Sequence, residues 1–356
     1  MMNKLQQCLL EKGANYCALI ISPENRKYFT DFESSDGFLL VSSNRAVFIT
    51  DGRYIEAAEN TINSAEVQLL EQKAFSQIGR ILDEMDCQHL LIEASRTTVS
   101  VYNSLKGVLK KTTISTDNTL DTIINTIRSV KTTDEVEKII KAQRIAESAF
   151  EHILNFIRVG VTEKEIALEL DFFMLKNGGE GLSFETIAVS GKNSSMPHGV
   201  PSNKKVENGD FVTMDFGTII GGYHSDMTRT IAVGFATDEM QNVYKAVLDA
   251  QCNCLSNIKA GISCKDGDAF ARDIIKSREY GQYFTHSTGH GVGVEIHEYP
   301  NLSPSSPSIL EKGNIVTVEP GIYIPGKFGV RIEDMAFIED NGCINLTKAP
   351  KELIII

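Results

Sequence analysis

The sequence predicts an α/β protein of the α+β kind with two domains, a smaller one over residues 1–125 and a larger one over residues 126–356. The first observation is length, because 356 residues exceed the size of one ordinary core. The second is that short β-branched segments alternate with helical patterns in the smaller domain. The third is that paired strands around tight turns recur in the larger domain, which is typical of antiparallel hairpins.

The composition restricts the class of protein and its partners. Hydrophobic residues make up 42% and charged residues 23% of the chain, a globular balance. The formal net charge of −12 argues against nucleic acid and anionic membranes as partners. No apolar run reaches the roughly 18 residues of a membrane span, and Glu11 and Lys12 interrupt the N-terminal segment, so we expect no signal peptide. Seven cysteines without a C-x-x-C pair indicate reduced thiols and a cytoplasmic location.

The smaller domain combines predicted strands and helices without a catalytic cluster. Asp51 is expected to cap a helix that starts at once, and we interpret Asp51 and Arg53 as structural. The other predicted elements are strands over residues 16–22, 37–42, 46–50 and 90–92 and helices over residues 77–85 and 99–109. Their alternation predicts a mixed or mostly parallel sheet.

The larger domain begins with two helices that carry their own start signals. Thr132 or Thr133 can cap a long amphipathic helix with an acidic first turn. Thr162 and Glu165 form a capping box for the next helix. Two further helices are predicted over residues 238–258 and 266–278.

A predicted hairpin over residues 211–234 places two carboxylates together. With the turn between Ile220 and Gly221, Asp215 faces Asp226. Two acids at directly opposite positions lie ~4.5–5.5 Å apart at Cβ and repel each other. A divalent metal ion between them would remove the conflict. The alternative is a solvated face, or a neighbouring Lys or Arg.

A second predicted hairpin, over residues 314–337, repeats this arrangement. Folding it about Gly326 brings Glu319 opposite Glu333. A pair of partly exposed glutamates is the alternative for this hairpin alone.

Histidines supply the other candidate groups. His286, His290 and His297 lie in one glycine-rich segment, and His198 lies on a small-residue loop after a predicted strand. The interleaved glycines allow a close approach of the backbone, but the segment lacks the strand and helix of a dinucleotide fingerprint. A single loop histidine such as His198 is more often a surface residue than a catalytic one.

Together, Asp215, Asp226, Glu319, Glu333 and His290 suit two divalent metal ions. Oxygen-rich ligation with one imidazole favours Mn²⁺, with Co²⁺, Fe²⁺ or Zn²⁺ able to compete. Two such ions activate water and polarise a carbonyl, which indicates hydrolysis of an amide. His198, His286 and His297 then remain for substrate binding, oxyanion stabilisation and proton transfer.

The strings MDFGTIIGGYHSDMTRT, STGHGVGVEIHE, VTVEPGIYIPG and GVRIED resemble those of the pita-bread metallopeptidases. That family contains methionine aminopeptidase, aminopeptidase P, prolidase and creatinase. The resemblance implies a catalytic domain of two pseudo-symmetric α/β halves with a curved antiparallel sheet. The string FITDGRY resembles the creatinase-like N-terminal domain of the proline-specific branch.

The resemblance also implies roles for the five metal-binding candidates. Asp215 would bind one metal ion, and His290 and Glu319 the other. Asp226 and Glu333 would bridge the two ions. Glu319 would also shuttle a proton.

The resemblance implies substrate contacts as well. His198 and His297 would contact the region of the scissile bond, and His286 and Arg331 match further active-site positions. Arg331 would either touch the substrate or orient Asp215. Family members are usually homodimers, so we expect one here.

The implied reaction is hydrolysis of Xaa-Pro bonds in proline-containing peptides. We favour an Xaa-Pro dipeptidase (prolidase), because the chain is compact and lacks long insertions. Asn301 stands where prolidase-like members often carry a basic residue, which supports the alternative of an aminopeptidase P acting on longer peptides. The remote alternatives are a metal-free creatinase-like hydrolase and a non-catalytic binding protein, both of which would have lost the ligands.

Overall fold

The computed structural model describes residues 1–356 and divides into two compact units, Met1–Arg128 and Ser129–Ile356. The predicted division lay after residue 125. None of the helices combines the length and the apolar character that crossing a bilayer requires.

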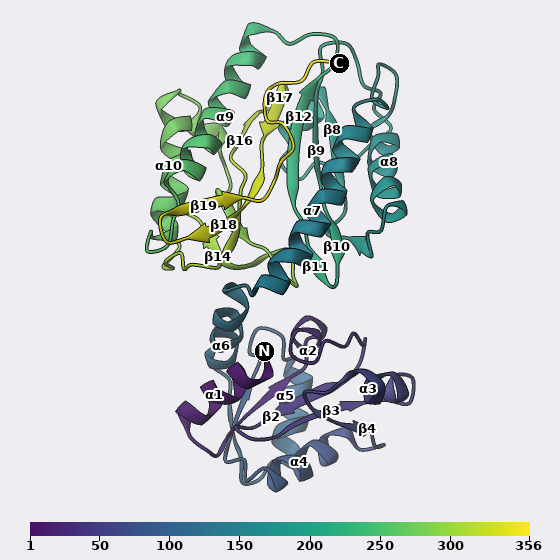
Figure 1. Ribbon diagram of the computed structural model, residues 1–356, viewed down its shortest axis with the longest axis vertical. Coiled ribbons are helices and arrows are strands. Elements are labelled where there is room, and N and C mark those ends of the chain that lie inside the picture. Colours follow the sequence, from purple (N-terminus) through teal and green to yellow (C-terminus); the bar gives the residue numbers. More distant parts are fainter. The chain divides into compact units, whose positions relative to one another are not determined.

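The first unit contains a six-stranded mixed sheet with the strand order β4-β3-β2-β1-β5-β6 (Figure 1). Neighbours β1–β5, β5–β6 and β3–β4 are parallel, whereas β1–β2 and β2–β3 are antiparallel, which confirms the mixed sheet. The strands are β1 Tyr16–Ile20, β2 Phe38–Val41, β3 Ala46–Thr50, β4 Glu66–Leu69, β5 His89–Ile92 and β6 Thr113–Ser115. The helices are α1 Met2–Lys12, α2 Pro23–Thr30, α3 Ile55–Thr61, α4 Ala74–Glu84, α5 Val99–Val108 and α6 Thr119–Ser129.

The predicted helix start at Asp51 is wrong. Helix α3 begins at Ile55, and Asp51 instead accepts a hydrogen bond from the backbone N–H of Arg53 at 2.8 Å. The Arg53 guanidinium also pairs with the same carboxylate at 2.7 Å. The carbonyl oxygen of Asp51 also accepts from the backbone N–H of Ile55 at 3.1 Å, so Asp51 stabilises the turn that leads into α3 and the regular helix starts later.

The first half of the second unit packs two helices on an antiparallel sheet of order β12-β9-β8. Thr132 and Glu135 form one capping box and Thr162 and Glu165 the other, as their spacing predicts. This half contains α7 Thr133–Ile153, α8 Glu163–Lys176, β7 Gly181–Leu182, β8 Ile187–Ser190, β9 Phe211–Phe216, β10 Thr218–Ile220, β11 Tyr223–His224 and β12 Met227–Ala232. Helices α7 and α8 share one apolar core with β8, β9 and β12.

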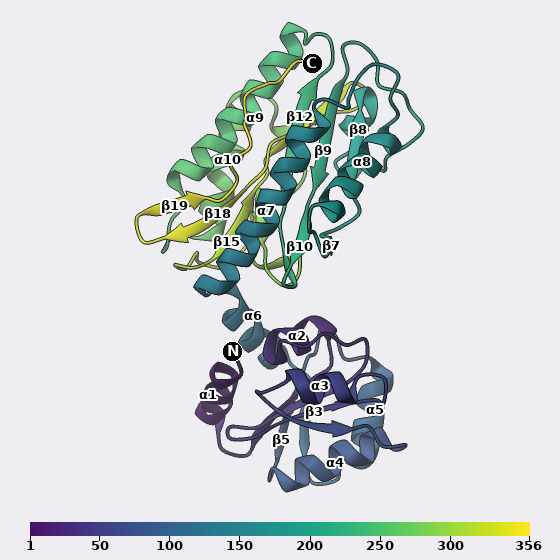
Figure 2. The ribbon, with the colours of Figure 1, turned by 45° about the vertical axis from the view of Figure 1, so that its right-hand side comes forward.

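The second half packs two further helices on a five-stranded antiparallel sheet of order β14-β13-β15-β18-β19 and on the pair β16-β17. Its elements are α9 Asp238–Asn257, α10 Cys264–Ser277, β13 Gly289–Gly291, β14 Glu298–Leu302, β15 Ile315–Val318, β16 Gly321–Ile324, β17 Phe328–Arg331, β18 Asp334–Glu339 and β19 Gly342–Asn345. Figures 1 and 2 show α9 and α10 on the opposite flank of these strands from α8. Each half therefore covers antiparallel strands with its own helix pair.

The register of the first hairpin differs from the prediction by two residues. Asp215 lies opposite Thr228, not Asp226. The turn consists of Gly221 and Gly222, which have φ values of 57° and 77°. A two-residue hairpin turn of this type needs positive φ at both positions, so the glycines occupy the turn and shift every pair. Because side chains alternate with a period of two, Asp226 still shares the face of Thr228.

The register of the second hairpin is confirmed. Val318 pairs with Asp334 and Gly321 with Arg331, so both strand pairs are symmetric about Gly326. Glu319 and Glu333 occupy symmetric positions in the interruption between the two pairs.

Candidate metal centre

A cavity of about 530 Å³ is lined by all nine residues that the sequence indicated. They are Asp215, Asp226, Glu319, Glu333, His198, His286, His290, His297 and Arg331. Asp215 lies on β9, His290 on β13 and Arg331 at the end of β17, while Asp226, Glu319 and Glu333 flank strand ends. The two halves of the second unit thus supply one site.

The ligand atoms of Asp226, His290 and Glu333 all lie within 4.8 Å of one another. Nε2 of His290 is 3.5 Å from Oδ2 of Asp226 and 3.4 Å from Oε1 of Glu319. These separations leave room for an ion among the oxygen and nitrogen atoms.

Electrostatics indicate that this group of acids needs a cation. Burial, reinforced by the charges of Asp215 and Glu319, raises the pKa of Asp226. Burial likewise raises the pKa of Glu333 above its ordinary value and that of Glu319 to about 8. Moreover, Oδ1 of Asp215 is buried and has no hydrogen-bond partner. A buried acceptor without a partner is costly, so the residues fit divalent cations.

His290 is suited to metal binding in its neutral form. Burial, together with the charge of His297, lowers the pKa of His290 to about 4. Its Nδ1 lies 3.0 Å from the carbonyl oxygen of Gly291. A proton on Nδ1 would satisfy that carbonyl and leave the lone pair of Nε2 directed at the carboxylates.

Arg331 holds one of the acids from the side. Its Nη2 donates to Oδ2 of Asp215 at 2.6 Å, and its Nε donates to Oγ1 of Thr228 at 3.0 Å. Its Nη1 donates to the hydroxyl of Tyr323 at 2.8 Å. Arg331 therefore orients Asp215 and also lines the cavity.

Sequence reasoning missed Thr228 and Tyr323. Thr228 donates its hydroxyl proton to Oε2 of Glu333 at 2.7 Å. The Tyr323 hydroxyl lies 2.9 Å from Nε2 of His286, and burial raises the pKa of Tyr323 to about 12. Strand alternation could have suggested both residues, because Thr228 follows Asp226 by two positions and Tyr323 follows Glu319 by four.

Apolar and polar side chains share the rest of the cavity wall. Phe184, Ile187, Pro197 and Ile296 are its apolar members, and Glu185, Ser287 and Asn301 are its polar members. Such a wall accepts an apolar side chain or ring and leaves polar recognition to a few groups.

Residues 137–340 match the model of metallopeptidase family M24, and residues 1–130 match that of the creatinase/prolidase N-terminal domain. The chain belongs to metallopeptidase family M24. It is therefore a peptidase, and membership of this family implies divalent metal ions.

Relatives of known name match nearly the whole chain. A Xaa-Pro dipeptidase from Pyrococcus furiosus is 37% identical, with 94% of this chain and 94% of that protein covered. The solved structure of a Xaa-Pro dipeptidase from Bacillus anthracis has a TM-score of 0.95 at 43% identity and covers 100% of this chain and 99% of that chain. The structure of an X-Pro aminopeptidase from Thermotoga maritima has a TM-score of 0.93 at 35% identity, with 100% of this chain and 99% of that chain covered.

Proposed function

We propose that this chain is a metal-dependent Xaa-Pro dipeptidase, a prolidase. The observation that carries the proposal is the convergence of four carboxylates and one neutral imidazole in a cavity that three more histidines line. The Pyrococcus and Bacillus relatives named Xaa-Pro dipeptidase support the choice of substrate.

We assign the metal ligands as the resemblance implies. Asp215 would hold one ion, His290 and Glu319 the other, and Asp226 and Glu333 both. Mn²⁺ fits this oxygen-rich set best, with Co²⁺, Fe²⁺ or Zn²⁺ as competitors. A bound pair of divalent ions supplies a nucleophilic hydroxide at neutral pH and polarises the scissile carbonyl.

The remaining residues bind the peptide and move protons. Glu319 would take a proton from the attacking water and return it to the leaving amine. His198 and His297 would contact the peptide around the scissile bond. His286, held against Tyr323, would complete the polar wall. The apolar side chains of the cavity would receive the proline ring.

An aminopeptidase P acting on longer peptides is the second candidate. Asn301 lines the cavity but carries no charge with which to pair a dipeptide's free carboxylate. The Thermotoga relative named X-Pro aminopeptidase is almost as similar in structure as the Bacillus dipeptidase. Relatives named putative Xaa-Pro aminopeptidase also occur among the sequence matches. We favour the dipeptidase because the similar solved structures are more often named prolidase or dipeptidase.

The proposal extends to the cellular setting of the enzyme. All seven cysteines are free thiols, which suits a reducing cytoplasm. The net charge of −12 disfavours nucleic acid and anionic membranes as partners. We propose a homodimer by analogy with the family.

The decisive experiment compares a Xaa-Pro dipeptide with the same peptide extended by one residue, with and without Mn²⁺. Faster Mn²⁺-dependent cleavage of the dipeptide would support the prolidase, whereas faster cleavage of the tripeptide would favour aminopeptidase P. Asp226→Ala is the matched control, since loss of a bridging ligand should abolish both activities. A protein that is purified gently and holds no stoichiometric metal would instead favour a metal-free hydrolase or a binding protein.

A further inference from the structure

Two pairs of consecutive residues link the side of β12 and β18 that faces the cavity to the opposite side of these strands. Thr228 and Arg229 lie on β12, Asp334 begins β18, and Glu333 immediately precedes that strand. Consecutive strand residues point to opposite faces. On the cavity side, Thr228 bonds Glu333 at 2.7 Å; behind the strands, Nη2 of Arg229 pairs with Oδ1 of Asp334 at 2.8 Å.

The Arg229 guanidinium also bonds the backbone of both front residues. Its Nη1 donates to the carbonyl oxygen of Thr228 at 2.9 Å and to that of Glu333 at 2.6 Å. The backbone N–H of Glu333 donates in turn to the Thr228 carbonyl at 3.1 Å. One buried side chain, 1% exposed, therefore fixes the main chain that carries Glu333 and its hydrogen-bond donor.

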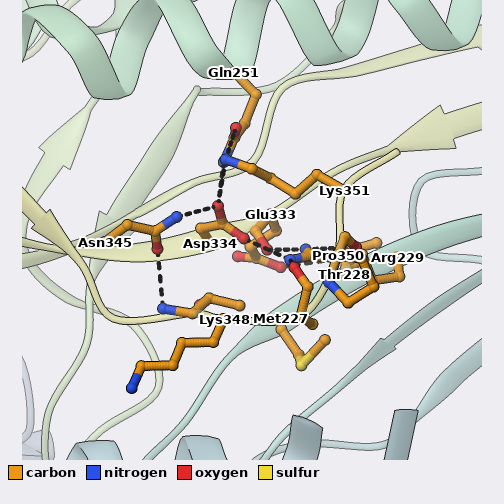
Figure 3. A network of polar contacts seen from close by, with 12 residues as sticks. Met227, Thr228, Arg229, Gln251, Glu333, Asp334, Asn345, Lys348, Pro350 and Lys351 are labelled. Atoms are coloured by element: carbon orange, nitrogen blue, oxygen red, sulfur yellow. Dashed lines mark hydrogen bonds and ion pairs between the residues drawn. The ribbon is translucent and has the colours of Figure 1, made fainter. Parts of the chain in front are cut away.

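The same guanidinium binds a segment near the end of the sequence (Figure 3). Nε of Arg229 donates to the carbonyl oxygen of Pro350 at 2.9 Å, and Nη2 donates to that of Ala349 at 2.8 Å. Nζ of Lys351 lies 2.9 Å from Oδ2 of Asp334. Residues 349–351 thus complete the shell around the ion pair.

The Asp334 carboxylate is satisfied on its other side as well. Oδ2 accepts hydrogen bonds from Gln251 at 2.9 Å and from Asn345 at 2.7 Å. The Arg229 guanidinium and the Asp334 carboxylate therefore have hydrogen-bond or ion-pair partners at every polar atom.

We infer that Arg229 and Asp334, together with residues 349–351, act as a rear clamp that positions the Glu333 carboxylate for metal binding. Well-packed apolar residues often replace a buried ion pair without loss of stability, so stability alone gives little reason for one here. A metal ligand, in contrast, must be held within about 0.5 Å of its working position. The inference rests on the proposed metal-binding role of Glu333.

The test measures Mn²⁺ affinity rather than peptide cleavage. Metal-free wild type, Asp334→Asn and Lys351→Met are titrated with Mn²⁺ by calorimetry, and the thermal midpoint of each is recorded. We expect Asp334→Asn to bind Mn²⁺ roughly tenfold more weakly, the lower end of the effect of residues that support metal ligands. Lys351→Met, whose side chain is 21% exposed in wild type, should fold and shift the affinity in the same direction by less.

The control is Ile275→Ala, a cavity-forming change at a buried position on α10 outside the clamp. It should lower the thermal midpoint and leave Mn²⁺ affinity unchanged. The inference fails if Ile275→Ala weakens Mn²⁺ binding as much as the clamp variants, or if Asp334→Asn binds Mn²⁺ normally. If Asp334→Asn does not fold, unchanged affinity in Lys351→Met overturns the inference. A wild type that binds Mn²⁺ but cleaves no Xaa-Pro peptide would remove the proposed substrate and leave the clamp standing.

Discussion

Replacing Thr228 with valine removes one hydroxyl from the support of the metal centre and keeps the shape of the side chain. That hydroxyl donates to Glu333 at 2.7 Å and accepts from Nε of Arg331 at 3.0 Å. Thr228 is fully buried, so water cannot replace either bond. The valine variant leaves Nε of Arg331 without its acceptor and the Glu333 carboxylate without the donor that orients it.

The expected loss of Mn²⁺ affinity in Thr228→Val follows from these two hydrogen bonds. A hydrogen bond to a charged group contributes about 1.5–3 kcal/mol, and each factor of ten in affinity corresponds to about 1.4 kcal/mol. If the bond to Glu333 matters mainly in the metal-bound form, Mn²⁺ affinity should fall by roughly 10–100-fold.

Calorimetric titration of the metal-free protein with Mn²⁺ measures this change directly. Thr228→Ser is the matched control, because it keeps the hydroxyl and loses only a methyl group. Wild-type affinity in Thr228→Val would refute the reasoning, as would equal losses in the valine and serine variants.

Three further predictions address the reaction, the substrate and the pH dependence. His198→Ala should lower kcat for the dipeptide while metal content measured by atomic absorption stays at the wild-type level; lost metal would make His198 a ligand. Asn301→Arg should raise kcat/KM for the dipeptide relative to the tripeptide, since it adds a charge for the free carboxylate; an unchanged ratio would contradict this role. Mn²⁺ affinity should rise with pH through about pH 8, because binding must displace the proton that Glu319 holds with its pKa of about 8. Because folding raises the pKa of Glu319, its protonated carboxyl contributes its full stabilisation of the metal-free protein below about pH 4.5. That contribution is lost as pH rises through about 8, so the thermal midpoint of the metal-free protein should fall across this range.

Local signals in the sequence predicted most elements and the residues that line the cavity. The capping boxes at Thr132 and Thr162 begin α7 and α8 because each is a contact between residues three apart. The symmetry of Glu319 and Glu333 about Gly326 followed from one turn and strand alternation, and both strand pairs keep that register. Such features depend on neighbours in the chain, so the sequence alone predicts them.

Tertiary structure decided the partners of these residues. The two-residue error at Asp215 arose because the backbone conformation of Gly221 and Gly222, not the count of residues, sets a hairpin register. The contact of Thr228 with Glu333 joins residues 105 positions apart. Which side chains meet across such a separation depends on how β12 packs against the start of β18, and no local pattern encodes that packing. The amino acids specify the chemistry of the candidate metal centre, but the fold alone selects the groups that orient its proposed ligands.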